Sequence, residues 1–207
     1  MSREMTRRGF LVSGVAAAVT GGSANDGGLA PVSLPGIPER SVPVLPAGAG
    51  SLKAFRAKCV GCQLCVKACP EKVLRPSRSL KRFLLPEMGF EYGYCRPACS
   101  RCAEVCPTGA IAPISRGEKV RTHVGHAMFH VDRCIAARHK VTCTACERHC
   151  PVKAITLVNG VPVLDSVSCI GCGACENLCP ARPMPAMTVE GNEVHRIGET
   201  VDFPLAY

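Results

Sequence analysis

The chain has 207 residues, and sixteen of them are cysteine, whereas it contains only six Phe, three Tyr and no Trp. This poor supply of aromatic side chains excludes a large conventional core and indicates a fold held together by metal or disulfide bonds. The formal charge of +9, from 25 Lys and Arg against 16 Asp and Glu, excludes an acidic chain.

The first 24 residues are typical of an export signal. They contain the stretch TRRGFL with Arg7 and Arg8, an apolar run from Phe10 to Val19, and small residues at 22–24. This succession of an arginine pair, an apolar run and small residues resembles a twin-arginine signal. The apolar run is too short to span a bilayer. We therefore predict a signal peptide over 1–24 and a periplasmic location. A retained membrane anchor or a chance arginine pair are the alternatives.

Residues 25–51 are rich in proline and glycine. This composition predicts an extended linker without a core of its own. We place the cysteine-rich domain at 52–192 and a C-terminal tail at 193–207.

The cysteines form four groups, and a proline directly follows the last cysteine of each group. The groups are Cys59, Cys62, Cys65 and Cys69; Cys95, Cys99, Cys102 and Cys106; Cys134, Cys143, Cys146 and Cys150; and Cys169, Cys172, Cys175 and Cys179. A repeat of this kind determines the prediction of the fold.

This spacing suits [4Fe–4S] clusters, because two residues between thiolates let a tight loop direct three sulfurs at three irons of one cube. In the bacterial ferredoxin pattern, the fourth cysteine ligates the other cluster of a pair. The proline redirects the departing chain. Gly61, Gly171 and Gly173 stand between ligands, where we expect the backbone to approach the cluster. Sixteen thiolates predict four [4Fe–4S] clusters.

Three other uses of the thiols suit the sequence less well. Disulfides would be usual in an exported protein, but they do not explain four similar quartets with trailing prolines. Structural zinc sites usually show two separated pairs of cysteines. The stretch CRPACSRC at 95–102 has the spacing of enzymes that cleave S-adenosylmethionine, yet Cys106 follows at once and no segment could form their barrel. No catalytic set of residues stands out, so we predict a protein that is not itself an enzyme.

Short β-hairpins are expected between the cysteine groups. The run AITLVNGVPVLD after Cys150 has two β-rich halves around Asn159-Gly160, a type I′ turn signal, with Pro162 on an edge strand. We expect similar hairpins at 110–132 and 186–197, and an inserted loop within 70–94. The predicted fold class is α+β, with ferredoxin-like dicluster modules made of short hairpins and short helices.

The segments Cys59–Pro70 and Cys169–Pro180, together with LPAGAGSLKAFRAKC at 45–59, carry a family resemblance. The chain resembles the NapG/MauM group of exported polyferredoxins, which is related to the four-cluster β subunits of molybdopterin oxidoreductases. The resemblance implies a periplasmic electron carrier between a membrane-bound quinol-oxidising donor and a periplasmic reductase, with peripheral membrane association. The alternatives are an electron-transfer subunit bound to a molybdopterin catalytic subunit, or a structural module.

The fourth ligands allow two pairings of the groups, between neighbours or in a nested order. The related β subunits use the nested order, and the two regular groups are the outermost, so we predict nesting. The predicted ligand sets are Cys59, Cys62, Cys65 and Cys179; Cys169, Cys172, Cys175 and Cys69; Cys95, Cys99, Cys102 and Cys150; and Cys134, Cys143, Cys146 and Cys106.

The positive charge does not indicate nucleic-acid binding, because negatively charged thiolate-bound clusters would offset most of it. A local basic patch at Arg75, Arg78, Lys81 and Arg82 could dock an acidic redox partner, or it could be a solvated loop. His149 stands beside Cys150 and could bond near a sulfur.

Overall fold

The computed structural model describes residues 36–198. The predicted signal peptide, residues 25–35 and the tail beyond 198 lie outside the described residues. Within 36–198, no helix combines the length and apolar character needed to cross a membrane.

The first and second cysteine groups lie on short helices joined by a small hairpin. Helix α2 (Leu52–Lys58) begins at Ser51, whose hydroxyl accepts a hydrogen bond from the Ala54 amide, as an N-cap does. The order continues with α3 (Leu64–Ala68), β1 (Leu74–Pro76), the 3-10 helix η1 (Leu80–Arg82), β2 (Pro86–Met88), α4 (Arg101–Glu104) and α5 (Arg116–Lys119). The loop expected within 70–94 is the connection between antiparallel β1 and β2.

The third and fourth groups repeat this plan. Their elements are α6 (Ile135–His139), α7 (Ala145–Arg148), β4 (Ile155–Val158), β5 (Val161–Leu164) and α8 (Ala174–Asn177). Asn159 and Gly160 both have positive φ between paired strands β4 and β5, so the predicted hairpin is confirmed. Short helices and two-stranded sheets together confirm a mixed α+β fold.

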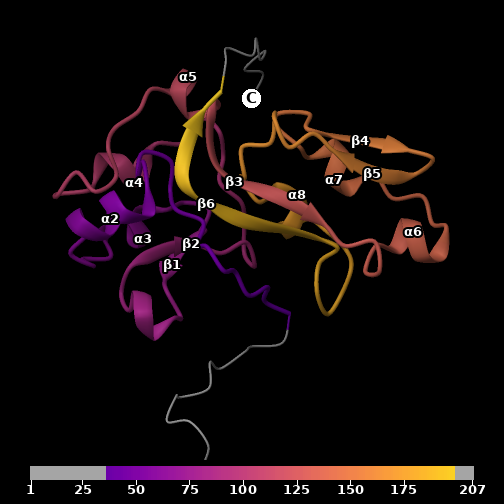
Figure 1. The fold of residues 1–207 in the computed structure, drawn as a ribbon, viewed down its shortest axis with the longest axis horizontal. Coiled ribbons are helices and arrows are strands. Elements are labelled where there is room, and N and C mark those ends of the chain that lie inside the picture. The colour runs from indigo at the N-terminus through magenta and orange to yellow at the C-terminus, as the bar shows by residue number, and fades with distance from the viewer. Residues whose placement is uncertain (1–35, 199–207) are drawn as a thin grey trace, which may run out of the picture. The chain divides into compact units, whose positions relative to one another are not determined.

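A longer antiparallel pair joins the two halves. Strand β3 (Thr122–Phe129) pairs with β6 (Met187–Ile197), and His126 lies opposite Glu190. Figure 1 shows α2, α3, α4, β1 and β2 on one side of this pair, and α6, α7, β4 and β5 on the other. The pair therefore positions the cysteine loops of both halves.

The hairpins predicted at 110–132 and 186–197 are wrong. The segment 186–197 contains one continuous strand, β6, and the first part of 110–132 holds α5 instead of a strand. Gly191, where we expected a turn, lies opposite Gly125 within the pair. A Cβ on Gly191 would come within 2.2 Å of the Pro43 carbonyl oxygen, so its role is close packing and not turning.

The linker prediction is also wrong for its second part, because residues 42–50 form a strap through the core. Val44 and Leu45 are fully buried. The strap hydrogen-bonds to three distant parts of the chain, through Met88 N to Val44 O (2.8 Å), Ala112 N to Gly48 O (2.9 Å) and His195 N to Gly50 O (2.7 Å). An extended, proline-rich segment leaves its carbonyls free for such bonds. The domain therefore begins before residue 52, and β6 carries it beyond 192.

Candidate metal centres

The structure gathers the thiols into four sites, each with three cysteines of one group and one from another. Site A is Cys59, Cys62, Cys65 and Cys106; site B is Cys69, Cys95, Cys99 and Cys102; site C is Cys134, Cys143, Cys146 and Cys179; site D is Cys150, Cys169, Cys172 and Cys175. Sites A, C and D each surround a pocket lined mainly by apolar side chains. All sixteen thiols are free of disulfides.

The nested pairing predicted from the sequence is wrong, and neighbouring groups exchange their fourth cysteines. Cys106 completes site A in place of Cys179, and Cys69 completes site B in place of Cys150. In the second half, Cys179 completes site C and Cys150 completes site D. The reason is helix packing: α3 packs against α4, and α7 against α8, so each helix pair delivers its last cysteines across the contact.

Burial makes several of the isolated thiols weaker acids. Burial, with smaller contributions from neighbouring thiolates, raises the pKa of Cys102 and of Cys172 to about 12. Burial and the nearby Cys59, Cys62 and Cys106 raise the pKa of Cys65 to about 11. Such thiols keep their protons at neutral pH unless a bound cation replaces them.

Backbone amides donate hydrogen bonds to the last cysteine of three of the four groups. The Ile111 amide donates to Cys106 Sγ (3.4 Å), the Ala154 amide to Cys150 Sγ (3.2 Å), and the Ala186 amide to Cys179 Sγ (3.2 Å). Amide donors stabilise a thiolate ligand and influence the reduction potential of a cluster.

These donor sets fit [4Fe–4S] clusters. Each site offers four soft thiolates, which iron–sulfur clusters require, from loops that converge from two segments. Apolar walls limit access of water, and the amides supply hydrogen bonds to sulfur. Within residues 36–198, no three His, Cys, Asp or Glu side chains close on a single metal ion.

We predicted that the glycines between ligands let the backbone approach a cluster. In the structure, two of them allow close packing against other parts of the protein. A Cβ on Gly171 would lie 2.6 Å from the Gly125 amide nitrogen, and a Cβ on Gly173 would lie 2.1 Å from the Phe90 ring. Both glycines also have positive φ, which disfavours other residues. They let the site D loop pack against β3 and the core.

Lys119 places a buried charge beside site B, which sequence reasoning missed. Its ammonium group donates to the carbonyl oxygens of Arg96 (2.8 Å) and Cys99, and it lies beside the Cys95 thiol of site B. The side chain is buried. Ser115 and Glu118 form a capping box that begins α5 and positions this lysine. The only sequence signal was that capping pattern, S-x-x-E.

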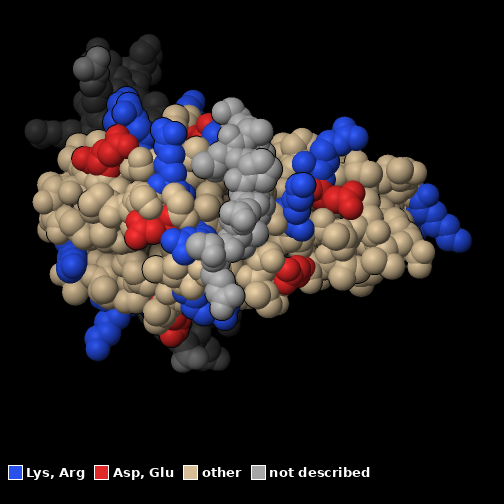
Figure 2. Space-filling view, turned by 90° about the horizontal axis from the view of Figure 1, so that it is seen from above, with Lys and Arg blue, Asp and Glu red and all other residues tan. Residues whose placement is uncertain are grey.

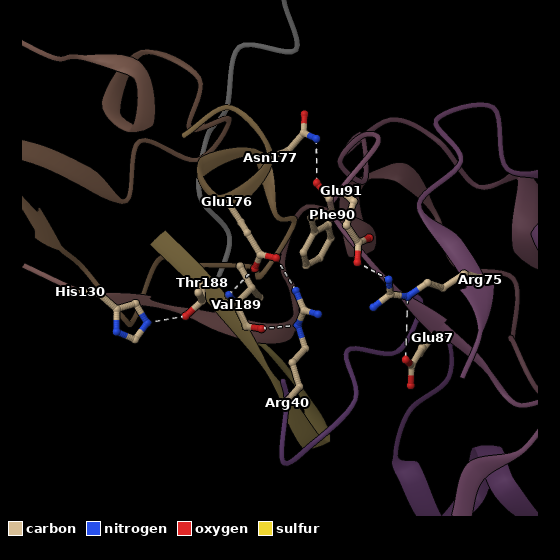
Figure 3. A network of polar contacts seen from close by, with 10 residues as sticks. All are labelled: Arg40, Arg75, Glu87, Phe90, Glu91, His130, Glu176, Asn177, Thr188 and Val189. Carbon is tan, nitrogen blue, oxygen red and sulfur yellow. Dashed lines mark hydrogen bonds and ion pairs between the residues drawn. The ribbon is translucent and has the colours of Figure 1, made fainter. Parts of the chain in front are cut away.

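A buried ion pair connects the segment before the strap to site D. The Arg40 guanidinium lies 2.5 Å from the Glu176 carboxylate, one residue after Cys175, and also donates to Val189 O (2.7 Å). Glu176 accepts from the Val189 amide (2.7 Å), and Arg40 lies over the Phe90 ring. Figure 3 shows these groups together, with Asn177 donating to Phe90 O. Burial raises the pKa of Glu176, and Arg40 acts in the opposite direction.

Sites B and D adjoin across the two halves. The Cys95 amide donates to the Cys172 carbonyl (2.9 Å), and the two thiols are close enough to interact electrostatically. Sites A and B also adjoin, since Cys65 contributes to the electrostatic environment of Cys102.

His149, which we expected near a sulfur, instead forms a hydrogen bond between its ring and the Ala145 carbonyl (2.9 Å).

Comparison with known proteins shows which family this chain resembles. A 4Fe-4S dicluster domain matches residues 58–110 and 141–183. The first match contains the whole first exchanged pair of groups, and the second contains all of the other pair except Cys134. The chain is 34% identical over 165 residues to the methylamine utilization ferredoxin-type protein MauM of Methylophilus methylotrophus, covering 69% of each chain.

Two further relatives agree with this assignment. Ferredoxin-type protein NapF of Escherichia coli is 28% identical over 73% of this chain and 87% of its own. Ferredoxin-type protein NapG of Haemophilus influenzae is 32% identical over 61% of this chain and 51% of its own. The chain therefore belongs to the family of ferredoxin-type iron–sulfur electron-transfer proteins that includes MauM, NapF and NapG.

Proposed function

We propose that this protein relays single electrons through four [4Fe–4S] clusters held in sites A to D. The observation that carries the proposal is the contact between the halves, where the Cys95 amide bonds to the Cys172 carbonyl. Together with the exchanged cysteines within each half, this contact supports a continuous order of sites: A, B, D, C. Because electron tunnelling falls steeply with distance, adjoining sites favour transfer through the whole domain.

The chain's own residues prepare the sites for this role. A [4Fe–4S] cluster, when bound, takes up and gives back one electron without breaking covalent bonds to its ligands. The thiolates would hold it, the Ile111, Ala154 and Ala186 amides donate hydrogen bonds to ligand sulfurs, and apolar walls limit the access of water. In this proposal the sites transfer electrons and do not transform a substrate.

We further propose that the protein works in the periplasm after export by the twin-arginine route. TRRGFL at residues 6–11 supports this location. Its electron donor is a membrane-bound quinol-oxidising protein and its acceptor a periplasmic reductase. The name of MauM assigns that relative to methylamine utilization, whereas the partners proposed for this chain rest on its resemblance to exported polyferredoxins.

Anaerobic purification with iron and sulfide analysis tests the cofactor count. We expect about sixteen irons per chain and reducible signals in an EPR-monitored redox titration. A colourless protein after reconstitution, or clusters that cannot be reduced, would contradict the proposal. Tight co-purification with a molybdopterin catalytic subunit would instead support the subunit role.

A further inference from the structure

An exposed apolar surface lies over site A. Its side chains come from the site A loop and from the loop that carries η1, and we call it the loop face. They are Val60, Leu64, Leu80, Phe83 and Leu84, with exposed fractions of 69%, 49%, 67%, 68% and 45%. A group of large exposed apolar side chains with polar residues around it is typical of a protein interaction site.

Hydrogen bonds hold the two loops of the loop face together. The Gln63 side-chain amide donates to Leu84 O (2.6 Å) and Gly61 O (3.0 Å), and Arg56 donates to Lys81 O (3.1 Å). Behind the face, Arg75 and Arg82 both form ion pairs with Glu87. These two arginines of the predicted basic patch therefore support the loop from inside, whereas Arg78 and Lys81 are exposed.

Site A reaches the protein surface beside the loop face. Of the sixteen thiols, all within the described residues, Cys62 of site A is the only one that is exposed. Val60 lines the site A pocket and is itself exposed at the face. A partner that covers this surface would lie within a side chain's length of the site.

Basic residues predominate in this part of the chain. Within residues 51–85 the one acidic residue is Glu71, which forms an ion pair with Arg96. The exposed basic residues in this range are Lys53, Arg56, Lys58, Lys67, Lys72, Arg78 and Lys81. Figure 2 shows that acidic and basic side chains are interspersed over the side of the molecule seen from above.

We propose that the loop face docks a redox protein whose own docking surface has an apolar centre and an acidic rim, and that electrons pass there through site A. This inference rests on the proposed electron-transfer function. Basic residues would steer an acidic partner, and the apolar centre would exclude water from the contact. A lipid surface also attracts basic and apolar residues, but it cannot accept an electron from site A, so the exposed Cys62 favours a protein.

Stopped-flow oxidation of the reduced holoprotein tests the docking surface, with an acidic flavodoxin as the probe. We expect Lys58→Glu with Lys81→Glu to slow the second-order reaction about tenfold or more at low salt, with the difference disappearing at high salt. Phe83→Ser should slow the reaction at both salt concentrations. The matched control, Arg116→Glu with Arg196→Glu, makes the same change in net charge on exposed residues away from the loop face and should react like the wild type.

The outcomes separate this inference from the proposed function. Wild-type protein without a reducible iron–sulfur signal would refute the proposed function itself. Normal cluster signals with equal rates for the Lys58 and Lys81 variant and its control would overturn the docking surface alone. Unchanged rates combined with lost binding to anionic vesicles would assign the face to a membrane, and unchanged rates with loss of a dimer would assign it to a second copy.

Discussion

At the scale of single residues, the main features outside the cysteine pattern are the buried charges beside the sites. Lys119 places an ammonium group next to site B, and the Arg40–Glu176 pair stands next to site D. A cluster's potential depends on the local charge and hydrogen bonds. Sites with the same four ligands can therefore differ in potential because of residues outside the cysteine pattern.

Replacing Lys119 with Met should lower the reduction potential of the cluster in site B. The lost positive charge no longer favours the reduced, more negative state, and a tenfold change in a one-electron equilibrium corresponds to about 59 mV. EPR-monitored titration measures the shift, and Lys119→Arg should retain most of the wild-type potential. Identical titration curves for Lys119→Met and wild type would show that the lysine has only a structural role.

Replacing Arg40 with Met should destabilise the holoprotein by about 3–5 kcal/mol, because Glu176 loses the partner of its buried charge. Burial already raises the pKa of Glu176 above its unfolded value, and loss of Arg40 raises it further. A raised carboxyl pKa means that the folded state loses stability as the pH rises above the unfolded pKa. The defect should therefore be larger at pH 8 than at pH 6.

Urea-induced bleaching of the cluster absorbance measures the Arg40 effect at both pH values. The double variant Arg40→Met with Glu176→Gln is the control, because it removes the unpaired charge. We expect it to recover much of the lost stability and to lose the added pH dependence. Equal defects in the single and double variants would exclude the unpaired carboxylate as the cause.

At the scale of elements, the strap and the β3–β6 pair organise the domain. The strap hydrogen-bonds to β2 through Val44 and to β6 through Val42, so it contacts elements distant in sequence. The β3–β6 pair joins residues separated by about the length of a dicluster module. These contacts fix the halves in the arrangement that brings Cys95 to Cys172.

Leu45→Ala should destabilise the domain by about 2–5 kcal/mol, as expected for a buried leucine. Leu45 is 2% exposed although it lies in a segment with the composition of a linker. The control Leu80→Ala removes the same atoms from a side chain that is 67% exposed and should have little effect. Equal thermal midpoints of bleaching for the two variants would contradict the assignment of the strap to the core.

At the scale of the whole molecule, the proposed relay requires that the chain reach the compartment of its partners with its cofactors inserted. The twin-arginine route exports folded proteins, and we expect folding here to depend on metal because few large side chains are available for a core. The predicted export signal and the four thiol sites are therefore consistent with one another.

Replacing Arg7 and Arg8 with Lys should leave the protein in the cytoplasm, because the twin-arginine pair is the recognised element of the signal. Cell fractionation with an antibody measures the distribution, and the full complement of iron in the retained protein would show that insertion precedes export. Lys53→Arg provides a control that alters a basic residue outside residues 1–24. Normal export of the arginine-pair variant would refute the predicted signal.

The local parts of this protein could be predicted from sequence. The ligand loops depend on residues two or three positions apart, so spacing alone indicated the cysteine groups and the dicluster family. The Asn159-Gly160 hairpin is equally local, and both residues adopt the positive φ that the turn needs.

The connections between distant segments were decided only by the tertiary structure. Which group receives Cys106 or Cys179 depends on the packing of α3 with α4 and of α7 with α8, and the spacing of cysteines is the same for either pairing. The strap, the β3–β6 pair and the burial of Lys119 likewise depend on partners far away in sequence. Local geometry restricts the chain over a few residues, whereas these contacts arise from the free energy of packing the whole domain.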